Sequence, residues 1–352
     1  MLISDVGLTA RKVGVRRKMK ISVVMATYNG AAFIIEQLDS IRLQSRKVDE
    51  VVISDDRSSD GTFEIVKKYI DDYHLRGWSI TYDTIGMGLR DNFYNALSQV
   101  TGDLVFLADQ DNRWILDKVA IVERIFMENP KIYCLNNSFK YMDEAGNEIS
   151  FKNKPNTENN GLILHRIEPG AIEKIPISLN LNKNIGPGLA MAVRKEIVQL
   201  YLEFSRRIEL HDFEINCIAA VMDALFFYNR GLDFYRIFEG QSVSIGIVKK
   251  RSKIMMLIEK IRSGKRGIGD RCRFIEELLS IESSKEIQEY LSTMLELQRV
   301  RESVAVWHHL DKWGDEHRMY KAIGKQYGNM DMRYCYIDLI SALMPNLQNR
   351  SK

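Results

Sequence analysis

The stretch GDLVFLADQDNRW, residues 102–114, runs from an apolar segment straight into two acids. The apolar run from Leu104 to Ala108 follows a turn signal and predicts a short buried strand. Asp109 and Asp111 come at its carboxyl end, where open α/β sheets bind their ligands. Two carboxylates in that place suit a divalent cation that keeps its other positions for water and phosphate oxygens. An isolated Asp-x-Asp also occurs in ordinary turns, so the interpretation depends on the rest of the chain.

The residues before this stretch alternate between strand and helix patterns. Short β-branched or apolar runs predict strands over residues 21–26, 51–53, 79–84 and 104–108. Apolar residues at helical spacing predict helices over residues 34–41, 63–70 and 93–100. This order predicts an α/β fold with a doubly wound, mostly parallel sheet that is flanked by helices.

Polar residues follow three of the predicted strands. They are Thr27 and Tyr28 after the first strand, Asp55 and Asp56 after the second, and Asp109 and Asp111 after the fourth. Because the carboxyl ends of parallel strands meet at one edge of a sheet, these side chains should line a nucleotide-sized crevice. No G-x-G-x-x-G follows the first strand, which argues against a dinucleotide-binding fold.

The later chain contains a polar excursion over residues 143–184, further core elements, and then a helical region. Strand-like runs cover residues 189–193, 225–228 and 234–236, and a helical pattern over 215–222 follows His211 and Asp212. From about residue 247 helical patterns continue almost to the end. We therefore expect a disordered tail over 1–19, an α/β domain over 20–246 and a helical C-terminal region over 247–352.

Composition excludes several classes of protein. The 352 residues are 45% hydrophobic and 28% charged, an ordinary globular balance, and the net charge of +3 makes no case for nucleic acid. The four cysteines are widely separated, which indicates free thiols in a reducing compartment rather than disulfides or a zinc site. No apolar run approaches the roughly 18 residues of a transmembrane helix.

Several short motifs occur in a fixed order between residues 24 and 236. They are VMATYNG at 24–30, QLDSI at 37–41 with Gln44, SDDRS at 54–58, Gly86 with Asn92-Phe93, the stretch 102–114, His211-Asp212, and Tyr235-Arg236. With these motifs the chain resembles a family 2 glycosyltransferase of the GT-A fold, and within that family the rhamnosyltransferase-like members of bacterial surface-polysaccharide synthesis. The resemblance covers about residues 20–246.

The resemblance implies transfer of a sugar such as rhamnose from a nucleoside-diphosphate donor to a saccharide acceptor, with inversion. It places Mg²⁺ or Mn²⁺ on Asp111 with Asp109, where the cation stabilises the leaving diphosphate. It places the nucleobase and ribose at the donor residues, which are Thr27, Tyr28, Asp55, Asp56 and Asp109.

Inversion requires a base opposite the leaving group, and the resemblance assigns this role to Asp212. Two residues beside it leave alternatives open: Glu214 is a weaker candidate base, and His211 either orients Asp212 or is an ordinary core histidine. Asp212 could instead cap the helix that follows. Asp55 and Asp56 could likewise form only a turn.

This sequence departs from the family pattern at three places. Position 112 is Asn where the family often has Asp, and position 238 is Phe where a His commonly follows the Tyr-Arg pair. The Gly-Pro-Gly step at 186–188 also differs, on the acceptor side. These departures leave open a catalytically weakened nucleotide-sugar-binding protein. A nucleotidyltransferase is a further alternative, although no Gly-rich loop with a basic residue follows the first strand.

The basic run KKRSK at 249–253 precedes an apolar helical pattern with Ile254, Leu257 and Ile261. This pattern is typical of a charged solvated helix face, or of a helix that contacts anionic lipid. Because acceptors in the family are often lipid-linked, we expect a cytoplasmic protein with peripheral contact at the inner face of the cytoplasmic membrane.

Overall fold

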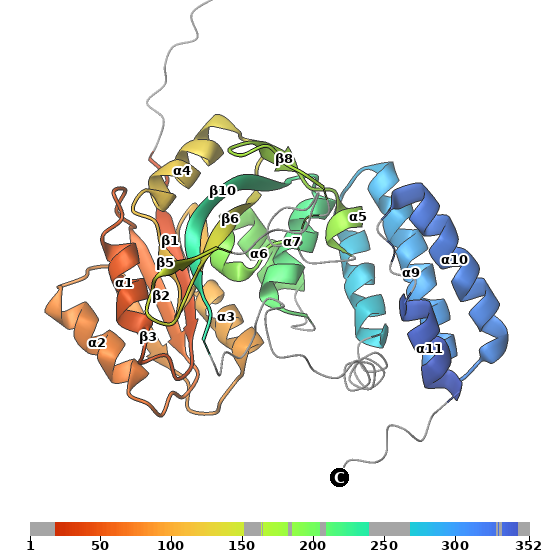
Figure 1. Cartoon of the computed structure of the whole chain (residues 1–352), viewed down its shortest axis with the longest axis horizontal. Coiled ribbons are helices and arrows are strands. Elements are labelled where there is room, and N and C mark those ends of the chain that lie inside the picture. Colours follow the sequence, from red (N-terminus) through yellow and green to blue (C-terminus); the bar gives the residue numbers. More distant parts are fainter. Residues whose placement is uncertain are drawn as a thin grey trace, which may run out of the picture.

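A computed structural model describes residues 18–150, 163, 165–181, 185–204, 209–238, 268–328, 330 and 333–343. A ten-stranded sheet with helices on both faces forms one side of the molecule, and C-terminal helices form the other (Figure 1). The first elements are β1 (Ile21–Thr27), α1 (Ile34–Arg42), β2 (Glu50–Asp55), α2 (Thr62–Asp72), β3 (Trp78–Tyr82), α3 (Leu89–Ser98) and β4 (Leu104–Asp109). The predicted order of strands and helices is confirmed over this part.

The middle of the chain contains more elements than the sequence predicted. They are β5 (Arg113–Trp114), α4 (Lys118–Glu128), β6 (Cys134–Met142), β7 (Glu148–Ile149), β8 (Ile172–Lys174), α5 (Ile177–Asn180), η2 (Gly188–Ala190), β9 (Met191–Arg194), α6 (Lys195–Phe204), α7 (His211–Val221) and β10 (Leu225–Arg236). The strand predicted over 189–193 begins as a 3₁₀ turn. The two strands predicted over 225–228 and 234–236 are one strand, β10, because pairing with β6 continues across a register shift at Gly231.

The sheet has the order β3-β2-β1-β4-β9-β6-β10-β5. Strands β3, β2, β1 and β4 are parallel, β9 runs antiparallel to both its neighbours, and β10 is parallel to β6. The register pairs Thr27 with Asp55 and Ala26 with Asp109. The ends of the first, second and fourth strands therefore lie side by side, as predicted.

The C-terminal helices are a helix over 268–280, α9 (Lys285–Ala305), η3 (Leu310–Lys312), α10 (Trp313–Tyr327) and α11 (Arg333–Leu343). The helix over 268–280 packs into the same apolar core as α7, through Phe274, Ile275 and Leu278. The basic run 249–253, the helical pattern after it, the expected boundary at 247 and most of the expected tail lie outside the described residues. No helix in the described ranges is both long and apolar enough to cross a bilayer.

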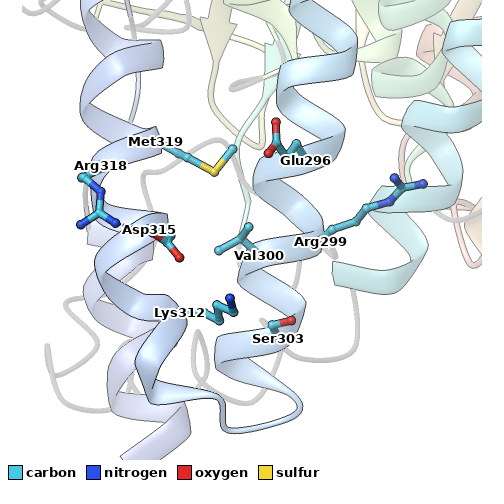
Figure 2. A pocket seen from close by; sticks show the side chains of 8 residues that line it. All are labelled: Glu296, Arg299, Val300, Ser303, Lys312, Asp315, Arg318 and Met319. Carbon is cyan, nitrogen blue, oxygen red and sulfur yellow. Dashed lines mark hydrogen bonds and ion pairs between the residues drawn. The ribbon is translucent and has the colours of Figure 1, made fainter.

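A groove of about 490 Å³ lies between α9 and α10 (Figure 2). The residues that line it are Glu296, Arg299, Val300, Ser303, Lys312, Asp315, Arg318 and Met319. Two of its three cations form ion pairs, Arg318 with Asp315 and Arg299 with Glu276. The groove belongs entirely to the C-terminal helices and contains none of the site residues predicted from the sequence.

Candidate active site

The loop after β1 is fastened to the loop after β4 by Gln110. The Tyr28 amide donates to Gln110 Oε1 (3.0 Å), and Gln110 Nε2 donates to the Tyr28 carbonyl (2.9 Å). Gly30 permits this approach, because a Cβ there would lie 2.3 Å from Gln110 Oε1. Tyr28 remains 56% exposed, so its side chain is available to a flat ligand.

Asp55 and Asp56 both accept hydrogen bonds within the protein. Asp55 is fully buried and accepts from the Thr27 hydroxyl (2.7 Å), and from the Ser58 amide (2.8 Å) and hydroxyl (2.7 Å). Asp56 accepts from the amides of Met87 (2.6 Å) and Gly88 (2.8 Å). The turn-forming role considered for this pair is therefore observed for Asp55, whereas Asp56 holds the distant segment at Met87 and Gly88. Since each carboxylate oxygen has two lone pairs, a further donor can still be accepted.

Asp109 lies in a cluster of acids. Burial and the negative charges of Asp111, Asp212 and Asp233 raise the pKa of Asp109 to about 8, and Lys118 partly offsets them. Strand β4 and helix α7 thus bring Asp109, Asp111 and Asp212 into one electrostatic neighbourhood. No group of three His, Cys, Asp or Glu residues arranged for a metal ion occurs within the described residues. Two carboxylates still suit a cation that takes the rest of its ligands from phosphate and water.

A buried ion pair between Lys118 and Asp233 lies close to Asp109 and was not predicted from the sequence. Lys118 Nζ donates to Asp233 Oδ1 (2.5 Å) and to the Leu189 carbonyl (3.0 Å), and both charged side chains are 0% exposed. Asn137 Nδ2 donates to the other Asp233 oxygen (2.6 Å). The only signal in the sequence is that Lys118 lies on the same face of α4 as the buried residues Val122 and Ile125.

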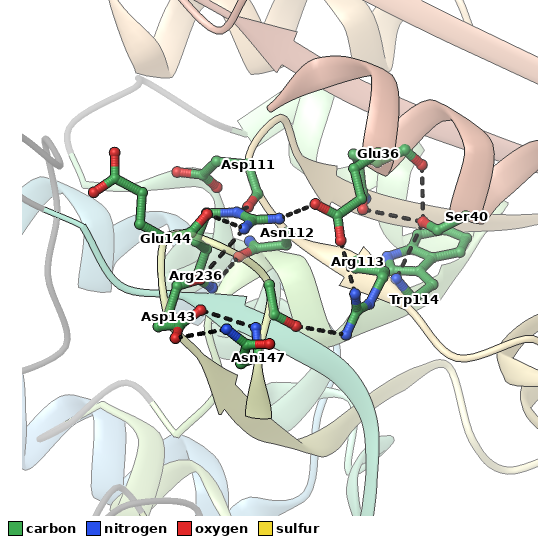
Figure 3. A network of polar contacts seen from close by, with 12 residues as sticks. Glu36, Ser40, Asp111, Asn112, Arg113, Trp114, Asp143, Glu144, Asn147 and Arg236 are labelled. Carbon is green, nitrogen blue, oxygen red and sulfur yellow. Dashed lines mark hydrogen bonds and ion pairs between the residues drawn. The ribbon is translucent and has the colours of Figure 1, made fainter. Parts of the chain in front are cut away.

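Arg236 connects the loop of the two acids to two other segments, the turn at 143–144 and helix α1 (Figure 3). Its Nε donates to the Asp111 carbonyl (2.9 Å), its Nη1 donates to the Glu144 carbonyl (2.7 Å), and its Nη2 pairs with Glu36 of α1. Its amide donates to Asn112 Oδ1 (2.9 Å). The Tyr-Arg motif therefore holds the backbone of the Asp-x-Asp loop through Arg236. The role of Glu36 was not foreseen.

Two of the three departures from the family pattern, Asn112 and Phe238, have structural consequences. Asn112 is fully buried and bridges Arg236 to Asp109, to which its Nδ2 donates (3.4 Å). The Phe238 ring packs on the Phe33 ring, with ring centroids 4.8 Å apart. The Arg236 guanidinium lies 4.7 Å from the centroid of the same Phe33 ring. Phe238 therefore acts as an apolar support, and its side chain has no atom that can bind a metal.

Asp212 lies in the first turn of α7 and is 8% exposed. The alternative role of Asp212 as the N-cap residue is not observed, because the helix begins at His211 and Leu210 occupies the N-cap position. Asp212 Oδ1 instead accepts from the Phe213 amide (2.7 Å).

His211 is 5% exposed and stacks on Phe93 with ring centroids 3.7 Å apart. Burial lowers its pKa to about 3, so the ring is neutral at physiological pH. Both ring nitrogens lack a hydrogen-bond partner among the described residues.

Comparison with known proteins identifies the family to which the chain is similar. A model of the family described as Glycosyl transferase family 2 matches residues 22–199. Poly(ribitol-phosphate) β-N-acetylglucosaminyltransferase TarS of Staphylococcus aureus is 36% identical over 96 residues, which are 27% of this chain and 16% of that protein. The dTDP-rhamnosyl transferase RfbG of Shigella flexneri is 33% identical over 118 residues, 32% of this chain and 40% of that protein. The matches thus span well under two thirds of these relatives.

Two solved structures resemble the whole described molecule. The structure of S. aureus TarS 1–349 with UDP-GlcNAc has a TM-score of 0.56 and 16% identity, and covers 94% of this chain and 90% of its own. The mannosyltransferase PcManGT of Pyrobaculum calidifontis, solved with GDP-Man and Mn²⁺, has a TM-score of 0.51 and 18% identity, with coverages of 94% and 89%. At such identities the likeness concerns the fold, and it confirms the predicted GT-A class.

Proposed function

Since this chain belongs to glycosyl transferase family 2, we propose that it transfers a sugar from a nucleoside-diphosphate donor to a saccharide acceptor. The observation that carries the proposal is the meeting of Asp109, Asp111 and Asp212 at one edge of the sheet. Two acids from the end of β4 lie within electrostatic reach of an acid from the first turn of α7. Burial, together with repulsion from Asp111, Asp212 and Asp233, raises the pKa of Asp109. A bound divalent cation would relieve that repulsion.

The donor half of the site is built on β1, β2 and β4. The exposed Tyr28 ring would lie against the nucleobase, and Asp56 and Asp55, with Thr27, would hold the base and ribose through their loops. Asp109 and Asp111 would hold Mg²⁺ or Mn²⁺, which neutralises the departing diphosphate. Two proteins of similar fold support a nucleotide-sugar donor, since TarS was solved with UDP-GlcNAc and PcManGT with GDP-Man.

The acceptor half of the site is built on α7. Asp212 would accept the proton of the acceptor hydroxyl as that oxygen attacks the anomeric carbon, with inversion of configuration. Its neighbour His211, being neutral and buried, would leave the negative charge on Asp212 uncompensated by an imidazolium. Asp212 is preferred to Glu214 as the base, because Asp212 is one of the acids whose charge acts on the pKa of Asp109 and so lies beside the donor acids.

The relatives support a substrate class. The name of RfbG supports rhamnose as the transferred sugar, and that of TarS, a poly(ribitol-phosphate) β-N-acetylglucosaminyltransferase, supports a polymer acceptor; both fit the surface-polysaccharide synthesis that we propose for this chain. A lipid-linked acceptor, with peripheral contact at the inner face of the cytoplasmic membrane through residues 249–253, extends this proposal. Liposome sedimentation at low and high salt tests the contact, because electrostatic binding to anionic lipid weakens as salt rises.

The Asp212→Asn variant tests the proposed chemistry. The asparagine Oδ1 can still accept from the Phe213 amide, so the local structure is kept while the proton acceptor is lost. Transfer should fall by about 10²–10⁴. Nucleoside-diphosphate affinity should not weaken, because the variant removes one of the charges that raise the pKa of Asp109. Near-parental turnover would remove Asp212 from the mechanism. A parent that binds donor with Mn²⁺ but neither transfers nor hydrolyses it would support a nucleotide-sugar-binding protein instead.

A further inference from the structure

We propose that Arg271, on the helix over 268–280, is a positioning residue that holds the Asp212 segment in place for the transfer step. The inference rests on the proposed role of Asp212 as the base. It assigns the C-terminal helices a part in the reaction, although they contribute none of the donor-site residues.

Arg271 contacts residues on both sides of Asp212 in the sequence. Its Nη2 pairs with Glu209 Oε1 at 2.8 Å, and its guanidinium lies 4.8 Å from the centre of the Phe213 ring. Its Nη1 also donates to the Leu181 carbonyl (3.3 Å), which fixes the group from a third direction. A planar guanidinium can make such contacts at once, because it presents five donors in a rigid fork and also stacks on an aromatic face.

Two hydrogen bonds connect the contacts of Arg271 with the Asp212 carboxylate and with the first turn of α7. Phe213, beneath the guanidinium, donates its amide to Asp212 Oδ1 (2.7 Å), so a shift of Phe213 moves the carboxylate directly. Glu209, the ion-pair partner, donates its amide to Glu214 Oε1 (3.0 Å), which closes the entry segment onto the first turn of α7. Arg271 thus supports both the entrance and the first turn of the helix that carries the base.

The helix that presents Arg271 is itself held firmly. Phe274, Ile275 and Leu278 are at most 3% exposed and belong to the core shared with α7, and the Phe274 ring lies 6.0 Å from that of Phe213. On its other side, a Cβ at Gly269 would lie 3.3 Å from Glu302 Oε1 of α9. The helix over 268–280 therefore lies between α7 and α9, and it transmits the position of the C-terminal helices to Asp212.

The experiment compares Arg271→Ala with Arg273→Ala in the full chain. Arg273 lies on the same helix with its side chain 68% exposed and pairs with Asp270, so its loss should leave turnover unchanged. Because a misplacement of about 1 Å can cost about 10²-fold in rate, Arg271→Ala should lower kcat for transfer by about ten- to a hundredfold. Donor KM and nucleoside-diphosphate affinity should stay within about twofold of the parent, and Arg271→Lys should recover part of the loss.

Glu209→Gln and Asp212→Asn complete the set. If Arg271→Ala does not fold, Glu209→Gln weakens the same ion pair at equal size and should lower kcat in the same direction. Equal kcat for Arg271→Ala, Arg273→Ala and the parent, in a protein that Asp212→Asn inactivates, would overturn the inference alone. So would a parallel loss of donor affinity and kcat in Arg271→Ala. Turnover that survives Asp212→Asn would overturn both the proposed base and this inference.

Discussion

Replacing Lys118 with Met should lower the free energy of unfolding by about 3–5 kcal/mol, the cost of breaking a buried pair by removing one partner. Lys118 and Asp233 are both 0% exposed, and Nζ lies 2.5 Å from Oδ1. Methionine fills a similar volume, so packing changes little. It leaves Asp233 as a buried carboxylate without its cation, and it leaves the Leu189 carbonyl without the Lys118 donor.

Lys118→Met should also weaken the binding of a divalent cation at Asp109 and Asp111. Lys118 is the positive charge that lowers the pKa of Asp109, against the three acids that raise it. Without Lys118 the Asp109 pKa should rise further above about 8, and a protonated carboxyl is a poor metal ligand. Binding of Mn²⁺ with a nucleoside diphosphate near neutral pH should therefore weaken in Lys118→Met.

Urea unfolding of the parent, Lys118→Met and Lys140→Met provides the measurement. Lys140 pairs with Glu148 at 3.1 Å with both side chains about half exposed, so its loss should cost only about 0–1 kcal/mol. Removing both charges, as in Lys118→Met with Asp233→Leu, should restore part of the stability. A Lys118→Met protein within about 1 kcal/mol of the parent would refute the reasoning, since that is the scale of an exposed pair.

Two further predictions concern His211 and the approach of Gly186 to β6. Because burial lowers the pKa of His211 to about 3, the unfolded chain binds a proton below about pH 6.5 that the folded chain does not. Stability should therefore fall by about 1.4 kcal/mol per pH unit as pH drops through that window, and His211→Phe should remove this slope; an unchanged slope in acid-unfolding curves would contradict it. Gly186→Ala should destabilise by about 1–3 kcal/mol, because its Cβ would lie 2.1 Å from Asn136 Oδ1. In Gly314→Ala, in α10, the new Cβ meets only ordinary contacts, so thermal unfolding should show no change or a gain in stability. Equal losses of stability in Gly186→Ala and Gly314→Ala would contradict this prediction.

The sequence predicted well those strands and helices whose apolar residues follow one clear pattern. β1, β2 and β4 are runs of β-branched and apolar residues, and their polar ends are visible because a parallel sheet places them at one edge. β6 is different, since its sequence CLNNSFKYM buries Asn136 and Asn137 and shows neither an apolar run nor a clean alternation. The side-chain amide nitrogens of these two asparagines donate to Asn216 and Asp233, which lie far along the chain.

The supporting residues of the site were harder to predict than its acids. Lys118 is 115 residues from Asp233, and Glu36 is 200 residues from Arg236, so neither pairing is visible at short range. The role of Arg271 likewise depends on how the C-terminal helices return to α7. Sequence motifs identify groups that meet a ligand, whereas long-range pairs appear only when the chain is folded.

Calorimetric titration of nucleoside diphosphates, with and without Mn²⁺, into the parent and Asp111→Asn tests the central claim most directly. If Asp109 and Asp111 hold a cation that holds the diphosphate, Mn²⁺ should tighten binding to the parent by about tenfold or more. The Asp111→Asn protein should lose that gain while unfolding at the parental temperature. A parent that binds equally well without Mn²⁺, or a variant that keeps the gain, would contradict the account.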